Sequence, residues 1–123
     1  MIEPGAVFEI PAALAQPPQV ATQSEPPVRE SRWVVVIANK RDCRDDGHAT
    51  VHVVLLSAQV EYAGRHDILI KVPDGGLQRE SIAQTDLTFV MLKRDLTLDR
   101  RRGVLLADSL RQVRAKVAET LGM

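Results

Sequence analysis

The hydrophobic pattern of the chain changes from short apolar runs over most of its length to a helical stripe at its C-terminal end. The most uniform run covers residues 33–38, where one tryptophan, three valines, one isoleucine and one alanine follow Arg32 without interruption. Continuous runs of this length and β-branched composition are typical of a strand buried on both faces. We therefore expect other elements to cover both sides of this strand.

Four further segments predict additional strands. The segment at residues 81–92 is expected to bend near Thr85 and Asp86, and the other three lie at residues 5–10, 50–57 and 66–72. Residues 73–76 read Pro-Asp-Gly-Gly, a strong turn signal, because proline presets φ and glycine tolerates positive φ. The charged stretches at residues 40–48 and 93–102 are expected to be connections.

The C-terminal region predicts one amphipathic helix over residues 107–121. Its apolar residues recur at spacings of three and four, which forms a single stripe: Leu106, Leu110, Val113, Val117 and Leu121. Asp108 suits a helix N-terminus and Gly122 suits a C-terminal stop. The whole pattern predicts a mainly β fold of five to six short strands, curled into a small barrel with the C-terminal helix packed on it.

Residues 11–30 interrupt this pattern with a segment rich in proline and glutamine. Proline cannot donate to a β-ladder, and a segment of this composition buries too little apolar area to offset the entropy of ordering. Long irregular segments inside small domains are usually functional or flexible. We interpret residues 11–30 as a flexible connection within a single domain that spans residues 1–123.

Composition and charge exclude several classes of protein. Sixteen basic residues balance 16 acidic ones, so a strongly basic nucleic-acid binder is not indicated, although a local basic patch stays open. The single Cys43 excludes an intramolecular disulfide and is typical of a reducing compartment. Its neighbours Arg41 and Arg44 would lower a thiol pKa, but a lone loop cysteine is more often incidental. The N-terminus lacks the pattern of a secretory signal, and no run is long enough to span a membrane, so we expect a cytoplasmic protein.

The order of these segments resembles the PemK/MazF family of bacterial toxins, which are small mRNA endoribonucleases of toxin–antitoxin modules. The resemblance runs from Gly5 to the end of the chain and rests on these motifs in order: PGAVFEI, RWVVVIAN, TVHVVLLS, GLQRES, KRDL and ETLGM. It implies an SH3-like barrel (PemK/MazF/CcdB-like) with a C-terminal helix, which is usually a homodimer. It also implies a cognate antitoxin, whose disordered tail would lie in the groove at the dimer interface and block the RNA path.

The resemblance also implies catalytic residues. Metal-independent RNA cleavage needs a deprotonated 2′-hydroxyl, stabilisation of the phosphorane charge and a protonated leaving group. Arg32 matches the family's catalytic arginine, whose planar fork suits a phosphate, and Ser57 matches the hydroxyl residue that bonds the same phosphate. Asp86 falls where some members carry an acidic catalytic residue and is the candidate base. The sequence shows no glycine-rich phosphate loop and no metal-ligand spacing, so neither a metal nor another cofactor is expected.

Four further residues are candidates for RNA binding: Gln84, Arg100, Arg101 and Arg102. Clusters of cations are typical of proteins that bind the backbone of single-stranded nucleic acids. Each candidate also has an ordinary interpretation. Arg32 would be a solvated strand border, Ser57 a local hydrogen-bonding group, and Asp86 a turn or bulge residue, while the three arginines would be a solvated loop.

The chain departs from the family pattern at several positions. Trp33 stands where a proline normally follows the arginine, and Gln84 and Thr85 stand where some members carry a further arginine and its neighbour. Residues 87–89 read Leu-Thr-Phe in place of Gln-Ile-Arg. The expected function is a type II toxin that cleaves single-stranded mRNA sequence-selectively without a metal. Two alternatives stay open, a non-catalytic dimeric binding module and a toxin of this fold that inhibits DNA gyrase.

Overall fold

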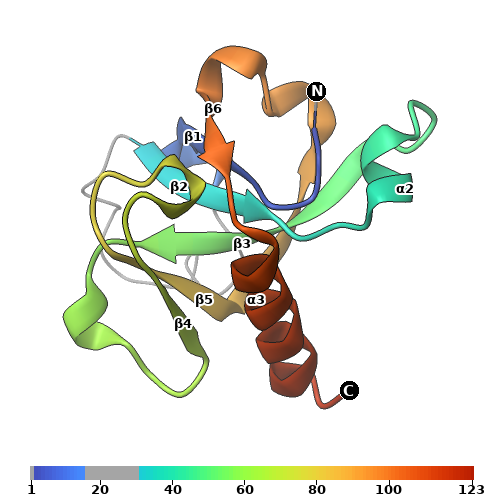
Figure 1. Ribbon diagram of the computed structural model, residues 1–123. Helices are drawn as coiled ribbons and strands as arrows, with labels where there is room; N and C mark the ends of the chain where they lie inside the picture. The colour runs from blue at the N-terminus through green and yellow to red at the C-terminus, as the bar shows by residue number, and fades with distance from the viewer. Residues whose placement is uncertain (1, 16–30) are drawn as a thin grey trace.

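The computed structural model describes residues 2–15 and 31–123 (Figure 1). Its strands are β1 Ala6–Pro11, β2 Ser31–Val36, β3 Thr50–Ser57, β4 Asp67–Ile70, β5 Ser81–Leu92 and β6 Arg101–Val104. Its helices are α2 Lys40–Arg44 and α3 Ala107–Thr120, with short 3-10 turns η1 Ala12–Leu14, η2 Val60–Tyr62, η3 Asp74–Gly76, η4 Lys93–Asp95 and η5 Leu98–Arg100. The predicted fold class, mainly β with a C-terminal helix, is confirmed. Of the predicted flexible connection, residues 16–30 lie outside the described residues.

The six strands form one antiparallel sheet in the order β4-β5-β3-β2-β1-β6. The sheet curls strongly, and α3 lies across one of its faces (Figure 1). The predicted bounds of β3 and β5 agree with the structure, and those of β1, β2, β4 and α3 agree within a few residues. In the described part of the chain, no helix is long and apolar enough to cross a membrane.

Strand β2 is covered on both faces, as its uniform apolar sequence predicts. Val34 and Val36 belong to one core cluster, which they share with Phe8 of β1 and Leu55 of β3. Val35 faces the opposite way, into a second cluster, which also contains Val7, Val54, Leu56, Ile70, Leu77, Ala83, Leu105, Leu110, Val113 and Val117. Only the middle three residues of the predicted α3 stripe are in this cluster, because Leu106 and Leu121, at the two ends of the helix, are exposed. Successive side chains of a strand point to opposite faces, so an uninterrupted valine run supplies both cores.

Strand β5 bends where the sequence predicts a bend. Val54 of β3 lies opposite Thr88, whereas the next residue, Leu55, lies opposite Gln84. The three residues between these partners, 85–87, form an irregularity of the bulge type. Within it, the buried Thr85 donates a side-chain hydrogen bond to the backbone oxygen of His66.

Two elements were not predicted. Strand β6, with the sequence Arg-Arg-Gly-Val, was interpreted as part of a charged connection, but it pairs with β1 at the edge of the sheet. The five-residue helix α2 is too short for an apolar period. It is stabilised by Asn39, whose side-chain oxygen accepts a hydrogen bond of 2.8 Å from the backbone N–H of Asp42.

Glycines allow the turn at η3 to pack closely against strand β6. Gly75 and Gly76 have φ values of 67° and 74°, in the left-handed region that favours glycine. A Cβ on Gly76 would lie 2.0 Å from the backbone oxygen of Arg102, and one on Gly103 would lie 2.6 Å from the carbonyl carbon of Gly75. The two backbones therefore touch, and this contact positions residues 77–81, which follow the turn.

Candidate functional site

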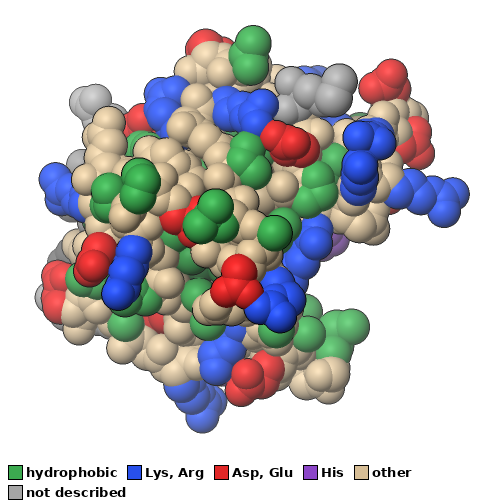
Figure 2. Space-filling model, viewed as in Figure 1, with side chains coloured by type: hydrophobic (Ala, Val, Ile, Leu, Met, Phe, Trp, Pro, Cys, Tyr) green, Lys and Arg blue, Asp and Glu red, His purple; other side chains and the backbone are tan. Residues whose placement is uncertain are grey.

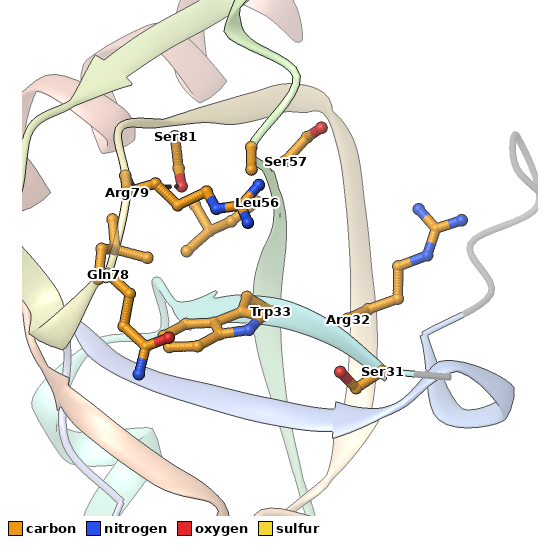
Figure 3. A pocket seen from close by; sticks show the side chains of 10 residues that line it. Ser31, Arg32, Trp33, Leu56, Ser57, Gln78, Arg79 and Ser81 are labelled. Carbon is orange, nitrogen blue, oxygen red and sulfur yellow. Dashed lines mark hydrogen bonds between the residues drawn. The ribbon is translucent and has the colours of Figure 1, made fainter. Parts of the chain in front are cut away.

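A pocket of about 530 Å³ opens where the start of β2, the end of β3 and the segment before β5 meet. Its lining residues are Ser31, Arg32, Trp33, Leu56, Ser57, Ala58, Leu77, Gln78, Arg79 and Ser81 (Figure 3). Strands β2 and β3 are antiparallel, with Trp33 opposite Leu56, so the first residues of β2 adjoin the last residues of β3. The η3 turn then brings residues 77–81 alongside them.

The pocket has two sides because successive side chains of a strand point to opposite faces of the sheet. Trp33 and Leu56 are a cross-strand pair and share one face of the sheet. Arg32 precedes that pair on β2 and Ser57 follows it on β3, so both are expected on the opposite face. In Figure 3 the side chains of Arg32 and Ser57 point away from the Trp33 ring, whereas Gln78 and Arg79 lie on the side of that ring.

Two serine hydroxyl groups are fixed by the local backbone. The Ser57 Oγ accepts a hydrogen bond of 3.2 Å from the backbone N–H of Gln59, which leaves its own O–H able to donate. The buried Ser81 donates through its Oγ to the backbone oxygen of Arg79 at 3.1 Å. The first contact orients a donor at the end of β3, and the second anchors the backbone that carries Arg79.

The pocket is lined by two arginines although the chain as a whole is neutral. Arg32 and Arg79 line it, and among the described lining residues none is acidic. Elsewhere, basic and acidic side chains are interspersed over the face of the molecule shown in Figure 2. Two guanidinium groups with several hydroxyl and amide donors suit an anionic ligand such as a phosphodiester.

A carboxylate outside the lining supports the β2 side of the pocket. Glu9 of β1 lies opposite Trp33 and accepts hydrogen bonds from Ser31 Oγ at 2.7 Å and from Arg102 Nε at 3.1 Å. The Ser31 bond, and then the bond and charge of Arg102 and a bond from Trp33, hold the pKa of Glu9 below its usual value against the opposing effect of burial. Glu9 is thus a charged acceptor that ties two lining residues to β1.

The pocket brings together two of the three predicted catalytic residues, Arg32 and Ser57. Asp86 is exposed in the irregular part of β5 and, like Gln84 before it, lies outside the lining. The predicted base therefore does not line the pocket that contains the predicted phosphate-binding pair.

The three consecutive arginines also lie outside the lining, and each is bonded within the chain. Arg100 donates to the backbone oxygen of Asp95 at 2.7 Å, Arg101 forms an ion pair with Glu3, and Arg102 pairs with Glu9. Their assignment to RNA binding stays a prediction.

Sequence reasoning missed the lining residues Ser31, Gln78, Arg79 and Ser81 as functional candidates. Arg79 lies in the GLQRES motif, which served only as a marker of the resemblance. The available signal was a cation between a strong turn and the start of strand β5, a place where a side chain is held near the end of the sheet. Trp33 was noted as a departure from the family pattern, and the structure places it in the pocket wall.

In the described part of the chain, neither Cys43 nor a cluster of metal-ligating residues forms a second candidate catalytic centre. Cys43 was expected in a polar loop, but it lies in α2 with only 7% of its surface exposed. Burial raises the pKa of its thiol, against the lowering effect of Lys93 and Arg114. Across residues 2–15 and 31–123, no three His, Cys, Asp or Glu residues gather in a way that could hold a metal ion.

Comparison with known proteins finds similarity in structure only. No protein-family model matches the chain, and no curated protein sequence matches it. Among solved structures, MazF from Deinococcus radiodurans is similar over 99% of this chain and 97% of its own, with a TM-score of 0.69 and 13% identity. An endoribonuclease from Mycobacterial species matches 99% of this chain and 92% of its own, with a TM-score of 0.67 and 14% identity.

A further solved structure is an endoribonuclease from Mycobacterial species in complex with its cognate antitoxin. The similarity covers 99% of this chain and 94% of the endoribonuclease chain, with a TM-score of 0.66 and 14% identity. At such identities the similarity establishes the fold alone. The likeness predicted from the order of sequence motifs is confirmed at that level, and the chain has the fold of the MazF endoribonucleases.

Proposed function

We propose that this protein is the toxin of a type II toxin–antitoxin module and a sequence-selective endoribonuclease that cleaves single-stranded mRNA without a metal. One observation carries the proposal. Arg32 and Ser57, the two phosphate-binding candidates of the sequence motifs, line the same pocket at the ends of two adjacent antiparallel strands. The fold shared with MazF endoribonucleases supports the same conclusion.

In the proposed reaction, the 2′-oxygen of a ribose bonds to the adjacent phosphorus while the bond from phosphorus to the 5′-oxygen breaks, which leaves a 2′,3′-cyclic phosphate and a 5′-hydroxyl. Solvent water takes the proton of the 2′-hydroxyl and supplies a proton to the leaving 5′-oxygen. The Arg32 guanidinium donates to the non-bridging phosphate oxygens, where charge develops, and the Ser57 hydroxyl donates to the same phosphate. Asp86 was the candidate base for the 2′-hydroxyl proton, but it lies outside the described pocket lining. The proposal therefore rests on Arg32 and Ser57.

The proposed partners follow from the same similarity. One of the structures with this fold is an endoribonuclease in complex with its cognate antitoxin. We expect this chain to form a cytoplasmic homodimer that is inhibited by a small antitoxin. A disordered antitoxin segment would then cover the pocket and exclude RNA.

The test is cleavage of mixed single-stranded RNA by the purified protein in the presence of EDTA. The proposal expects discrete cleavage products, a large loss of rate in Arg32→Ala and Ser57→Ala, and an unchanged rate in Arg44→Ala. Arg44 is an exposed arginine in α2, outside the pocket, and is therefore a matched control. Absence of cleavage by the wild-type protein, or equal cleavage by Arg32→Ala, would overturn the proposal.

A second candidate function is a module that binds RNA without cutting it. One observation favours it, because no carboxylate and no imidazole stands among the described lining residues to act as a general base. This candidate predicts saturable binding of single-stranded RNA that depends on Arg32 while the RNA stays intact over long incubation. Product formation that Arg32→Ala abolishes would exclude it.

A further inference from the structure

The Trp33 side of the pocket has no part in the phosphate chemistry of Arg32 and Ser57. We infer that this side is a nucleotide subsite next to the cleaved bond, in which the base stacks on Trp33 and the adjoining phosphate binds Arg79. The inference rests on the proposed function for its ligand class, single-stranded RNA. It adds two residues and one binding subsite to that function.

The shape and lining of this side suit a nucleobase. The half-buried indole of Trp33 faces the pocket, with the apolar side chains of Leu56 and Leu77 in the same lining (Figure 3). Base stacking on an aromatic side chain is the main sequence-tolerant contact with single strands. The volume of the whole pocket, about 530 Å³, lies within the range of roughly 300–1,000 Å³ that is typical of small-molecule sites, which suits a ligand of nucleotide size.

The Trp33 ring is held before any ligand arrives. On one side its cross-strand partner is Glu9, and on the other side its partner is Leu56. Glu9 is fixed in turn by Ser31 and by Arg102. A ring that is already oriented loses little conformational freedom on binding, which favours affinity.

Arg79 supplies the charge that a nucleotide requires. It is exposed, its side chain lies in the pocket on the Trp33 side, and its backbone oxygen is anchored by the buried Ser81 (Figure 3). No acidic residue is found among the described lining residues to neutralise it. A cation beside an aromatic platform is the combination by which proteins hold single-stranded nucleic acids.

The two sides of the pocket correspond to successive parts of one strand of RNA. Arg32 and Ser57 project from one face of the β2–β3 pair, while Trp33 projects from the other face one residue away. A chain that crosses this end of the sheet would present a phosphate to the first pair and the neighbouring base to the indole. The subsite therefore selects for an unpaired base beside the cleaved bond.

The experiment uses a short single-stranded 2′-O-methyl RNA, which lacks the attacking hydroxyl. Trp33 is the sole tryptophan of the chain, so its emission reports the subsite directly. We expect saturable quenching of that emission, with the same midpoint as the anisotropy of a labelled oligonucleotide. Anisotropy should show binding roughly 5- to 150-fold weaker for Trp33→Ala and little changed for Trp33→Phe.

The proposed phosphate contact of Arg79 is tested through the salt dependence of oligonucleotide affinity. Loss of one phosphate contact in Arg79→Gln should reduce the slope of log affinity against log salt by about 0.7, whereas Arg44→Ala should leave the slope unchanged. An unchanged Trp33 emission, or wild-type affinity in Trp33→Ala, would overturn the inference even if Arg32-dependent cleavage persists. Quenching and weakened binding without any cleavage of ordinary RNA would instead support the subsite and overturn the nuclease.

Discussion

Two groups of arginines differ in whether they line the pocket. Arg100, Arg101 and Arg102 stand together in the sequence, and each is bonded to a carboxylate or a backbone oxygen of the same chain. Arg32 and Arg79 are far apart in the sequence, yet both line a pocket whose described lining contains no acidic residue. The comparison teaches that a conspicuous run of cations can be bonded within its own chain, while arginines far apart in the sequence can line one pocket.

The largest expected effect is on catalysis. Arg32→Ala should lower kcat/KM for single-stranded RNA by roughly 10²–10³, the loss typical of removing one donor to a developing oxyanion. Steady-state cleavage of a labelled RNA measures it. Arg101→Ala, which removes an ion pair with Glu3, should leave kcat/KM within a few-fold of wild type. An equal loss in both variants would remove the distinction between the two groups.

The next effect concerns the backbone contact between the η3 turn, which precedes Arg79, and strand β6, which contains Arg101 and Arg102. Gly103→Ala should lower the free energy of unfolding by about 1–3 kcal/mol, because its Cβ would lie 2.6 Å from a backbone carbon of Gly75. Urea denaturation measures it. Gly64→Ala is the control, since the nearest atom to its Cβ would be a side-chain oxygen of Asp67 at 3.8 Å. Equal stability of the two variants would show that the turn and β6 are not in close contact.

A smaller effect separates two roles for Arg102. As a positioning residue, Arg102 acts through Glu9, so Arg102→Ala should lower stability by about 0.5–1 kcal/mol and weaken oligonucleotide binding several-fold. Glu9→Gln should do the same, and the double variant should be no worse than either alone. Direct contact with RNA predicts the opposite pattern, in which Arg102→Ala weakens binding at full stability and Glu9→Gln does not.

The smallest effect is on the pH dependence of stability. The pKa of Glu9 is held below its ordinary value of 4.5 in the fold, so the unfolded chain binds this proton more readily. The contribution of Glu9 is therefore complete above about pH 4.5 and is lost as the pH falls toward the lowered pKa. Urea midpoints of the wild type and Glu9→Gln should converge on acidification. A constant difference between them would contradict the shift.

Sequence reasoning recovered the elements that carry their own pattern. Strands β3 and β5 have clear apolar or alternating residues and polar ends, and the α3 stripe has helical spacing, so their positions follow from local chemistry. Strand β6 has no such pattern, because an edge strand paired only with β1 leaves charged side chains near solvent. Its existence depends on a partner distant in the chain.

The same reason explains what was missed at the site. Arg32 and Ser57 were selected by resemblance, but Arg79 joins them only through the turn at η3 and its contact with Gly103. That contact cannot be predicted from the local sequence, because the two segments are far apart in the chain. The local sequence likewise does not show that Glu9, in the first strand, accepts hydrogen bonds from residues of both β2 and β6.

The pairing of β1 with β6 has a consequence for how fast the protein reaches its native state. Phe8 lies opposite Arg101, so the first and last strands pair across a sequence separation that includes most of the chain. Folds dominated by such distant pairings close large loops before gaining contacts, and they fold slowly for their size. The η3 turn is in backbone contact with Gly103 of β6. The segment that carries Arg79 is therefore expected to reach its final position only after β6 has paired with β1. The pocket would then be among the last parts of the molecule to form.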